Sequence, residues 1–92
     1  MSYTLAFSKN ALEDIKNHKK SGDRSVLKKI EILLNELMAH PTTGKGQPEM
    51  LKHNLQGLYS RRINKKHRLV YAIKEEANTV YVLNAYFHYE DK

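Results

Sequence analysis

The sequence has no cysteine and no tryptophan, and it has only two prolines and four glycines among 92 residues. Without cysteine, the chain has no disulfide scaffold, no zinc–thiolate site and no cysteine nucleophile. The longest purely apolar run covers residues 69–73, whereas a membrane helix needs about 20 such residues. No basic segment precedes an apolar stretch near the N-terminus, so no secretory signal is indicated. We therefore expect one domain over residues 1–92, cytoplasmic and with no membrane partner.

Acidic residues are scarce in the middle of the chain. Overall there are 16 Lys and Arg residues against 10 Asp and Glu residues, a net charge of +6. Residues 47–74 hold seven basic side chains and one acidic side chain, Glu49, whereas residues 75–92 are net acidic. A small basic domain favours anionic partners such as nucleic acid or an acidic protein. Glu49 therefore either neutralises its neighbours or has a chemical task.

Hydrophobic periodicity predicts one strand and two helices in the first half. Residues 3–7 alternate as a strand, and Ser8 and Gly22 are suited to begin and end a helix. On that short helix, Ala11, Leu12 and Ile15 are expected to share an apolar face. A second helix is predicted between Asp23 and residues 40–41, and its apolar stripe comprises Val26, Leu27, Ile30, Leu33, Leu34 and Leu37.

The second half reads as three strands after a loop at residues 41–48. Residues 58–63, 68–73 and 79–83 are rich in strand-forming residues and are joined by short polar turns, which is typical of an antiparallel meander. With two helices on one face, the fold class is α+β. We expect Leu69, Tyr71 and Ile73 to face those helices. Arg62 and Arg68 flank the first turn, but sequence alone does not fix their pairing register.

Four residues supply the groups that metal-free RNA cleavage needs. A base must take the 2′-OH proton, cations must stabilise the phosphorane, and an acid must protonate the leaving 5′-oxygen. Glu49, the arginines Arg62 and Arg68, and His88 fit these tasks. A solvated basic sheet face explains the arginines equally well. No paired-histidine motif occurs, so neither a metal nor a cofactor is expected.

Three motifs and the C-terminal His88–Tyr89 pair carry a family resemblance. Residues 44–55 (GKGQPEMLKHNL), 59–63 (YSRRI) and 67–71 (HRLVY) closely resemble the YoeB/Txe toxins of bacterial toxin–antitoxin modules, within the RelE/ParE superfamily. The resemblance implies a β-α-α-β-β-β order, with a mainly antiparallel four-stranded sheet covered on one face by two helices.

The same resemblance implies an activity and a set of site residues. The activity is ribosome-dependent cleavage of mRNA within the translated codon, without a cofactor, held in check by a YefM-like antitoxin. Glu49 would be the general base, Arg68 the transition-state cation and His88 the general acid. Four further residues are assigned to contacts with RNA or the ribosome: Arg62, Tyr89, Lys52 and Arg61.

Two other classes of function stay open at this stage. A ParE-like toxin would share the fold but act by binding gyrase, and a plain RNA-binding module would need only the basic face. Neither needs the acid–base set of Glu49 and His88, which favours the nuclease. Homodimer formation, the codon preference and the effect of the extension at residues 90–92 are left open.

Overall fold

The computed structural model describes residues 2–42, 49–50 and 57–86, with only the backbone at 49–50. The elements described run in the following order: β1 (Thr4–Phe7), α1 (Lys9–Ser21), α2 (Arg24–Ala39), β2 (Glu49–Met50), β3 (Leu58–Arg62), β4 (Arg68–Lys74), the 3₁₀ helix η2 (Glu75–Ala77) and β5 (Thr79–Asn84). The predicted α+β class and the order of the longer elements are confirmed.

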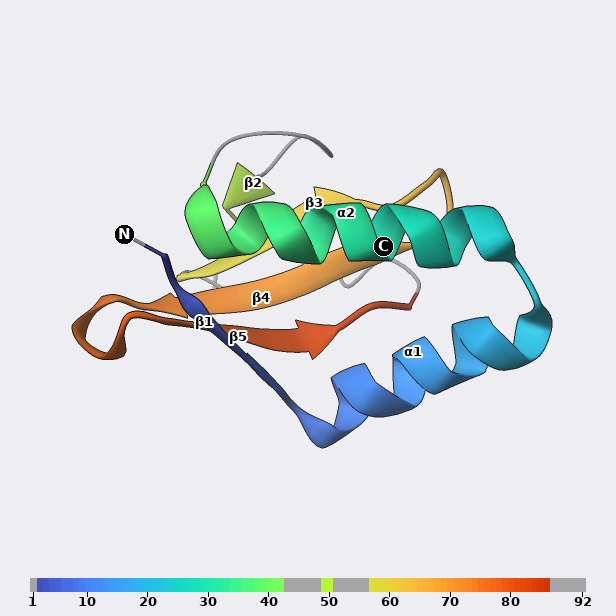
Figure 1. The fold of residues 1–92 in the computed structure, drawn as a ribbon, viewed down its shortest axis with the longest axis horizontal. Helices are drawn as coiled ribbons and strands as arrows, with labels where there is room; N and C mark the ends of the chain where they lie inside the picture. Colours follow the sequence, from blue (N-terminus) through green and yellow to red (C-terminus); the bar gives the residue numbers. More distant parts are fainter. Residues whose placement is uncertain (1, 43–48, 51–56, 87–92) are drawn as a thin grey trace.

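The sheet is mixed, in the order β1-β5-β4-β3-β2 (Figure 1). β3, β4 and β5 form the predicted antiparallel meander, while β1 pairs with β5 in parallel. The two-residue strand β2 adds a fifth member at the edge, antiparallel to β3. No strand was predicted there, because two residues are too few to show a period-two pattern.

Both helices begin and end where the sequence predicts. The Ser8 side chain accepts a hydrogen bond from the Ala11 amide at the start of α1, and Gly22 ends that helix with a φ of 75°. Glycine has no Cβ and adopts that left-handed conformation without steric strain. Asp23 caps α2 by accepting from the Val26 amide, and α2 ends at Ala39, just before His40 and Pro41.

The core lies between the helices and one face of the sheet. Figure 1 shows α2 lying over the strands and α1 beside it, next to β5. The core cluster includes Leu69 and Tyr71 of β4, and Ile73 packs against it, so their predicted orientation is confirmed. From α2 the cluster takes Val26, Ile30, Leu33 and Leu37. On α1 the prediction is wrong for Leu12, which is 56% exposed, because only Ala11 and Ile15 lie against the core.

A tight turn joins β3 to β4 and sets the pairing of these strands. The Asn64 carboxamide oxygen accepts from the amides of Lys66 and His67, each at 2.8 Å. The Ile63 amide donates to the His67 carbonyl at 2.9 Å and closes the turn. This arrangement uses the asparagine preference for turns. As a consequence, Arg62 and Arg68 become the last pair of the ladder before the turn.

Candidate functional site

β3 is the strand on which the predicted site residues meet. Its Ser60 pairs with Glu49 of β2 on one side and with Val70 of β4 on the other. Two pairs further along, Arg62 lies directly opposite Arg68. The register therefore places Glu49, the sole acid of residues 47–74, one strand away from Arg62 and two strands away from Arg68. These residues are distant in sequence, so the sheet is what assembles them.

Arg68 is held by a hydrogen bond across the β3–β4 ladder. Its Nη1 donates to the Ser60 hydroxyl at 3.1 Å, and Ser60 is buried. Arg68 itself is half-buried, while Arg62 is exposed. Like charges placed directly opposite one another on a sheet repel. An anion bound between Arg62 and Arg68 would relieve that repulsion, so the geometry suits phosphate.

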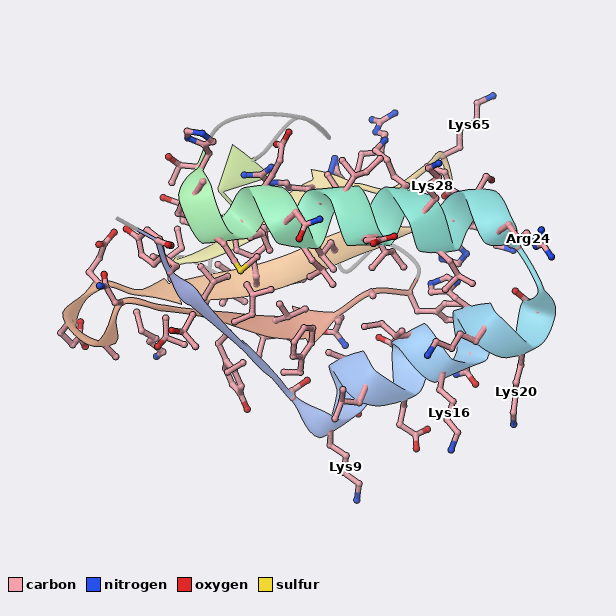
Figure 2. The ribbon with its side chains drawn as sticks, viewed as in Figure 1. Lys9, Lys16, Lys20, Arg24, Lys28 and Lys65 are labelled. Atoms are coloured by element: carbon pink, nitrogen blue, oxygen red, sulfur yellow. The ribbon has the colours of Figure 1, made fainter. Side chains whose placement is uncertain are left out.

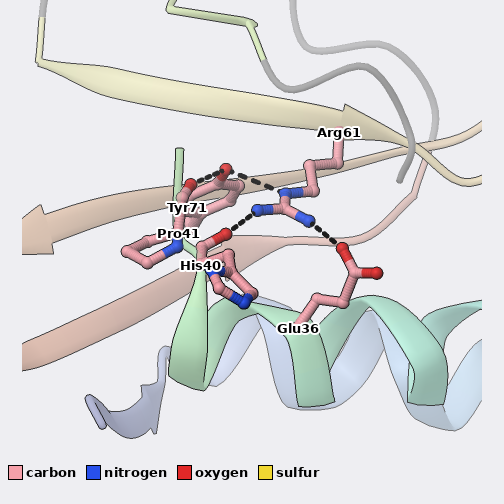
Figure 3. Close-up of polar contacts among 5 residues, drawn as sticks. All are labelled: Glu36, His40, Pro41, Arg61 and Tyr71. Atoms are coloured by element: carbon pink, nitrogen blue, oxygen red, sulfur yellow. Dashed lines mark hydrogen bonds and ion pairs between the residues drawn. The ribbon is translucent and has the colours of Figure 1, made fainter. Parts of the chain in front are cut away.

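Arg61 does not reach the surface, which is at odds with the expected contact to RNA. Its exposure is 0%, and its Nη1 pairs with the Glu36 carboxylate at 2.9 Å (Figure 3). Its Nε donates to the Tyr71 hydroxyl at 3.2 Å, and its Nη2 donates to the His40 carbonyl. Successive residues of a strand point to opposite faces, so Arg61 enters the core while Arg62 faces outward. We therefore exclude Arg61 from the substrate-binding set.

Tyr71 completes this buried polar group. Its hydroxyl donates to the Pro41 carbonyl at 2.6 Å, and its ring stacks on Tyr59 with centroids 5.8 Å apart. Burial raises the pKa of Tyr71 above its ordinary value, and the hydrogen bond and charge of Arg61 offset part of that rise. The phenol therefore stays protonated at neutral pH and remains a hydrogen-bond donor to the Pro41 carbonyl.

The end of β5 is fastened to α1 by polar contacts that sequence reasoning missed. The Asp14 carboxylate accepts from the Ala85 amide at 2.9 Å, and His18 Nε2 donates to the Ala85 carbonyl at 2.7 Å. The Ser8 hydroxyl donates to the Leu83 carbonyl at 2.8 Å. Asp14 and His18 lie one helical turn apart, so both can reach one peptide unit. The four-residue spacing of Asp14 and His18 was the only signal of this attachment in the sequence. Such spacing is common in helices, so it did not single out these two residues.

Three aromatic rings pack beside that attachment. His18 is buried and meets His67 and Tyr86 edge-on, with ring centroids 4.7 Å apart in each case. His67 stacks on Tyr86 with centroids 4.6 Å apart. The cluster joins α1, the β3–β4 turn and the chain just after β5. His67 immediately precedes Arg68, so the cluster ties the arginine pair to the C-terminal segment.

Three predicted site residues, Lys52, His88 and Tyr89, lie outside the described part of the chain, as does the Glu49 side chain. Their roles stay predictions. Ala85, which α1 holds, is three residues before His88, so the chain between them spans at most about 11 Å.

The outer surface of the two helices and of the β3–β4 turn carries many cations. The labelled side chains Lys9, Lys16, Lys20, Arg24, Lys28 and Lys65 extend away from the body of the molecule (Figure 2). All six are exposed.

Within residues 2–42, 49–50 and 57–86, no helix is long and apolar enough to cross a membrane. The same ranges hold no group of three or more His, Asp or Glu residues arranged to bind a metal.

Comparison with known proteins extends the resemblance to most of the chain. Residues 7–89 match a family described as the YoeB-like toxin of bacterial type II toxin–antitoxin systems. Toxin YoeB of Escherichia coli strain K12 is 49% identical over 55 residues, which make up 60% of this chain and 66% of the relative, just under two thirds of its length.

Solved structures show the same fold. The YoeB/ParE toxin from Agrobacterium tumefaciens superposes with a TM-score of 0.87 at 30% identity, covering 94% of this chain and 99% of that one. A chain of the YoeB–YefM complex from Staphylococcus aureus gives a TM-score of 0.79 at 39% identity, covering 95% and 98%. The fold predicted from the sequence motifs is thereby confirmed.

Proposed function

Because this chain belongs to the family of YoeB-like toxins of bacterial type II toxin–antitoxin systems, we propose that it is a ribosome-dependent mRNA endonuclease. The observation that carries the proposal is the register around Ser60. Ser60 pairs with Glu49 and binds Arg68, and Arg68 lies opposite Arg62. A candidate base and two phosphate-binding cations are therefore grouped on adjacent strands.

In the proposed mechanism the 2′-OH of the message is the nucleophile. Glu49 takes its proton, and the oxygen attacks the adjacent phosphorus. Arg68 and Arg62 stabilise the added negative charge of the phosphorane, an electrostatic effect that is large in sites sheltered from water. His88 protonates the departing 5′-oxygen. The products are a 2′,3′-cyclic phosphate and a 5′-hydroxyl, so atoms and charge balance without a metal or cofactor.

Two further residues complete the proposed substrate site. Tyr89 positions the message beside His88, and Lys52 adds a cation for RNA or the ribosome. The like-charge pair of Arg62 and Arg68 supports phosphate binding, because a bound anion would reduce the repulsion between the two guanidinium groups.

The proposed partner that restrains this activity is an acidic, YefM-like antitoxin. The solved Staphylococcus aureus relative is a YoeB–YefM complex, and another is a YoeB dimer. This chain carries a net charge of +6, which favours an acidic partner through electrostatic complementarity. For the toxin without its antitoxin, we propose a homodimer in the cytoplasm.

Translation of a defined message by purified ribosomes tests the proposed function. We expect cuts within the translated codons, no cuts in the same message without ribosomes, and no cuts once the antitoxin is added. Binding without cleavage would favour a plain RNA-binding module. Arrest of DNA gyrase with an intact message would favour the ParE-like alternative.

A further inference from the structure

A group of exposed cations at one end of the molecule has no part in the proposed reaction. They come from the end of α1, the start of α2 and the β3–β4 turn, and together they form what we call the basic rim: Lys19, Lys20, Arg24, Lys28, Lys65 and Lys66. All six side chains are exposed. Figure 2 shows four of them extending outward along one side of the molecule: Lys20, Arg24, Lys28 and Lys65.

Packing beneath the rim holds its three segments together. The two helices are separated only by Gly22 and Asp23. His18, which directly precedes Lys19, is buried and meets the ring of His67 edge-on with centroids 4.7 Å apart. His67 directly follows Lys66, so the end of α1 lies against the β3–β4 turn. The rim is therefore one continuous, fixed surface.

Helix electrostatics separates two of these cations from the others. Lys19 and Lys20 lie in the last turn of α1, where the helix dipole favours positive charge. Arg24 and Lys28 lie at the start of α2, where the dipole disfavours it, and the first turn of that helix holds no acidic residue. Four residues apart, they also repel each other on the helix surface.

No ion pair offsets that repulsion. In the part of the chain that the structure describes, neither Arg24 nor Lys28 pairs with a carboxylate. The nearest acid in sequence, Asp23, accepts hydrogen bonds from the Val26 amide and the Ser25 hydroxyl. The two cations therefore oppose the folding of α2, and a bound anion would relieve the repulsion between them.

The composition of the rim favours RNA over a protein as the source of that anion. A nucleic-acid backbone presents a row of phosphates, which lysine and arginine bind without further contacts. A protein interface needs apolar or aromatic anchors at its centre. Among residues 2–42 and 57–86, the exposed large apolar side chains are Leu12 and Tyr81, and neither belongs to the rim.

We propose that the basic rim docks the phosphate backbone of folded RNA of the ribosome, at a surface separate from the cleavage site. The inference rests on the proposed function for the ribosome as partner. The β3–β4 turn lies between Arg62 and Arg68, so the rim adjoins the pair that is proposed to bind the phosphate at the cut. RNA held at the rim would set the affinity for the ribosome, whereas the rate of cutting depends on the site itself.

The test compares two double variants that lose the same charge. Arg24→Gln with Lys28→Gln removes the two rim cations that oppose folding. Lys9→Gln with Lys74→Gln is the matched control, because both positions are exposed and lie outside the rim. The probes are purified ribosomes without message and a synthetic RNA duplex, so neither measurement involves cleavage. Binding is measured over a range of salt concentrations, since each phosphate contact adds to the salt dependence.

For the rim variant we expect roughly 10-fold weaker binding to both probes, and a slope of log affinity against log salt that is smaller by about 1–2. The control should bind both probes within about twofold of wild type. The rim variant should melt at or above the wild-type temperature, because α2 loses two unfavourable charges. A lower melting temperature would mean that these cations serve the fold, contrary to the proposal.

Cleavage of a ribosome-bound message supplies a second readout. For the rim variant, the toxin concentration that gives half-maximal cleavage should rise roughly 10-fold, while the single-turnover rate at saturation should change less than about twofold. A loss confined to the saturated rate would place these residues in the chemistry and overturn the inference.

Three further outcomes would overturn it as well. Equal weakening in the two double variants would show a general effect of net charge. Weaker binding to ribosomes with unchanged binding to the RNA duplex would indicate a contact with ribosomal protein. Weaker binding to the antitoxin alone would indicate an acidic protein as the partner of the rim. Absence of cleavage by wild type, with rim-dependent binding to both probes, would instead contradict the proposed function and leave the docking surface intact.

Discussion

Arg68 donates a hydrogen bond to the hydroxyl of Ser60, and Ser60 is the residue that pairs with Glu49. One small buried side chain thus connects the proposed transition-state cation with the strand that carries the proposed base. The bond spans β3 and β4, at 3.1 Å, so the regular ladder fixes its geometry. It gives Arg68 a fixed direction that an exposed arginine would lack.

Ser60→Ala should lower the single-turnover rate of message cleavage by about 3–10-fold, because Arg68 loses a positioning hydrogen bond. Arg68→Ala should lower it by about 10²–10³-fold, since it removes the charge itself. In the Arg68→Ala background, Ser60→Ala should have no further effect. Additive losses would show that Ser60 does not act through Arg68.

Glu36→Ala should lower the free energy of unfolding by about 2–3 kcal/mol, because it removes the ion pair between the Glu36 carboxylate and the buried Arg61 guanidinium. Glu36 is a quarter exposed, so water limits the loss. Glu31→Ala, at an exposed position of the same helix, is the control and should change stability by less than about 0.5 kcal/mol. Urea denaturation measures both. Equal losses of unfolding free energy in Glu36→Ala and Glu31→Ala would mean that the ion pair adds nothing to stability.

Asp23 should make stability depend on acid pH. Its pKa is lowered by the hydrogen bond from the Val26 amide and then by that from the Ser25 hydroxyl. A lowered folded-state pKa gives stability that is present above the unfolded value, about 3.9, and lost as pH falls through the folded value. Asp23→Asn keeps a capping side chain without that ionisation. Between pH 7 and pH 2 the melting temperature of wild type should therefore fall more steeply than that of Asp23→Asn. Parallel plots of melting temperature against pH would contradict this.

His18→Phe should slow cleavage by about 10-fold by releasing the Ala85 carbonyl, and with it the segment that carries His88. A message with a 5′-thio leaving group at the cut site needs no proton donor. With that substrate the loss should shrink to less than about twofold, since only acid catalysis is impaired. Asn17→Ala, at an exposed position of α1, is the control. A loss of equal size on both substrates would mean that His18 does not act through the acid.

Local patterns predicted most of the fold. The caps at Ser8 and Asp23 and the stop at Gly22 depend on neighbours in sequence, and all are confirmed. The apolar stripe of α2 is confirmed at five of its six positions, while Leu27 lies outside the core cluster. β2 escaped prediction because its two residues are strand only through their pairing with β3.

The sequence and its family motif named the candidate site residues, whose roles stay predictions, but their contacts could not be predicted. The family motif led us to expect both Arg61 and Arg62 at the RNA, whereas alternation along a strand places them on opposite faces of the sheet. Burial of Arg61 follows from partners on α2 and β4 that are 25 and 10 residues away, which no local pattern shows. The attachment of Ala85 to Asp14 and His18 spans about 70 residues and was invisible for the same reason.

The most direct test of the account is the chemistry of the cut ends on a ribosome-bound message. Wild type should produce a 2′,3′-cyclic phosphate, or the 3′-phosphate derived from it, and a 5′-hydroxyl on the downstream fragment. Replacing the 2′-OH at the cut site by hydrogen should abolish cleavage, and Glu49→Gln should slow it by about 10²–10⁴-fold. A 5′-phosphate product, or cleavage of the 2′-deoxy message, would contradict the mechanism.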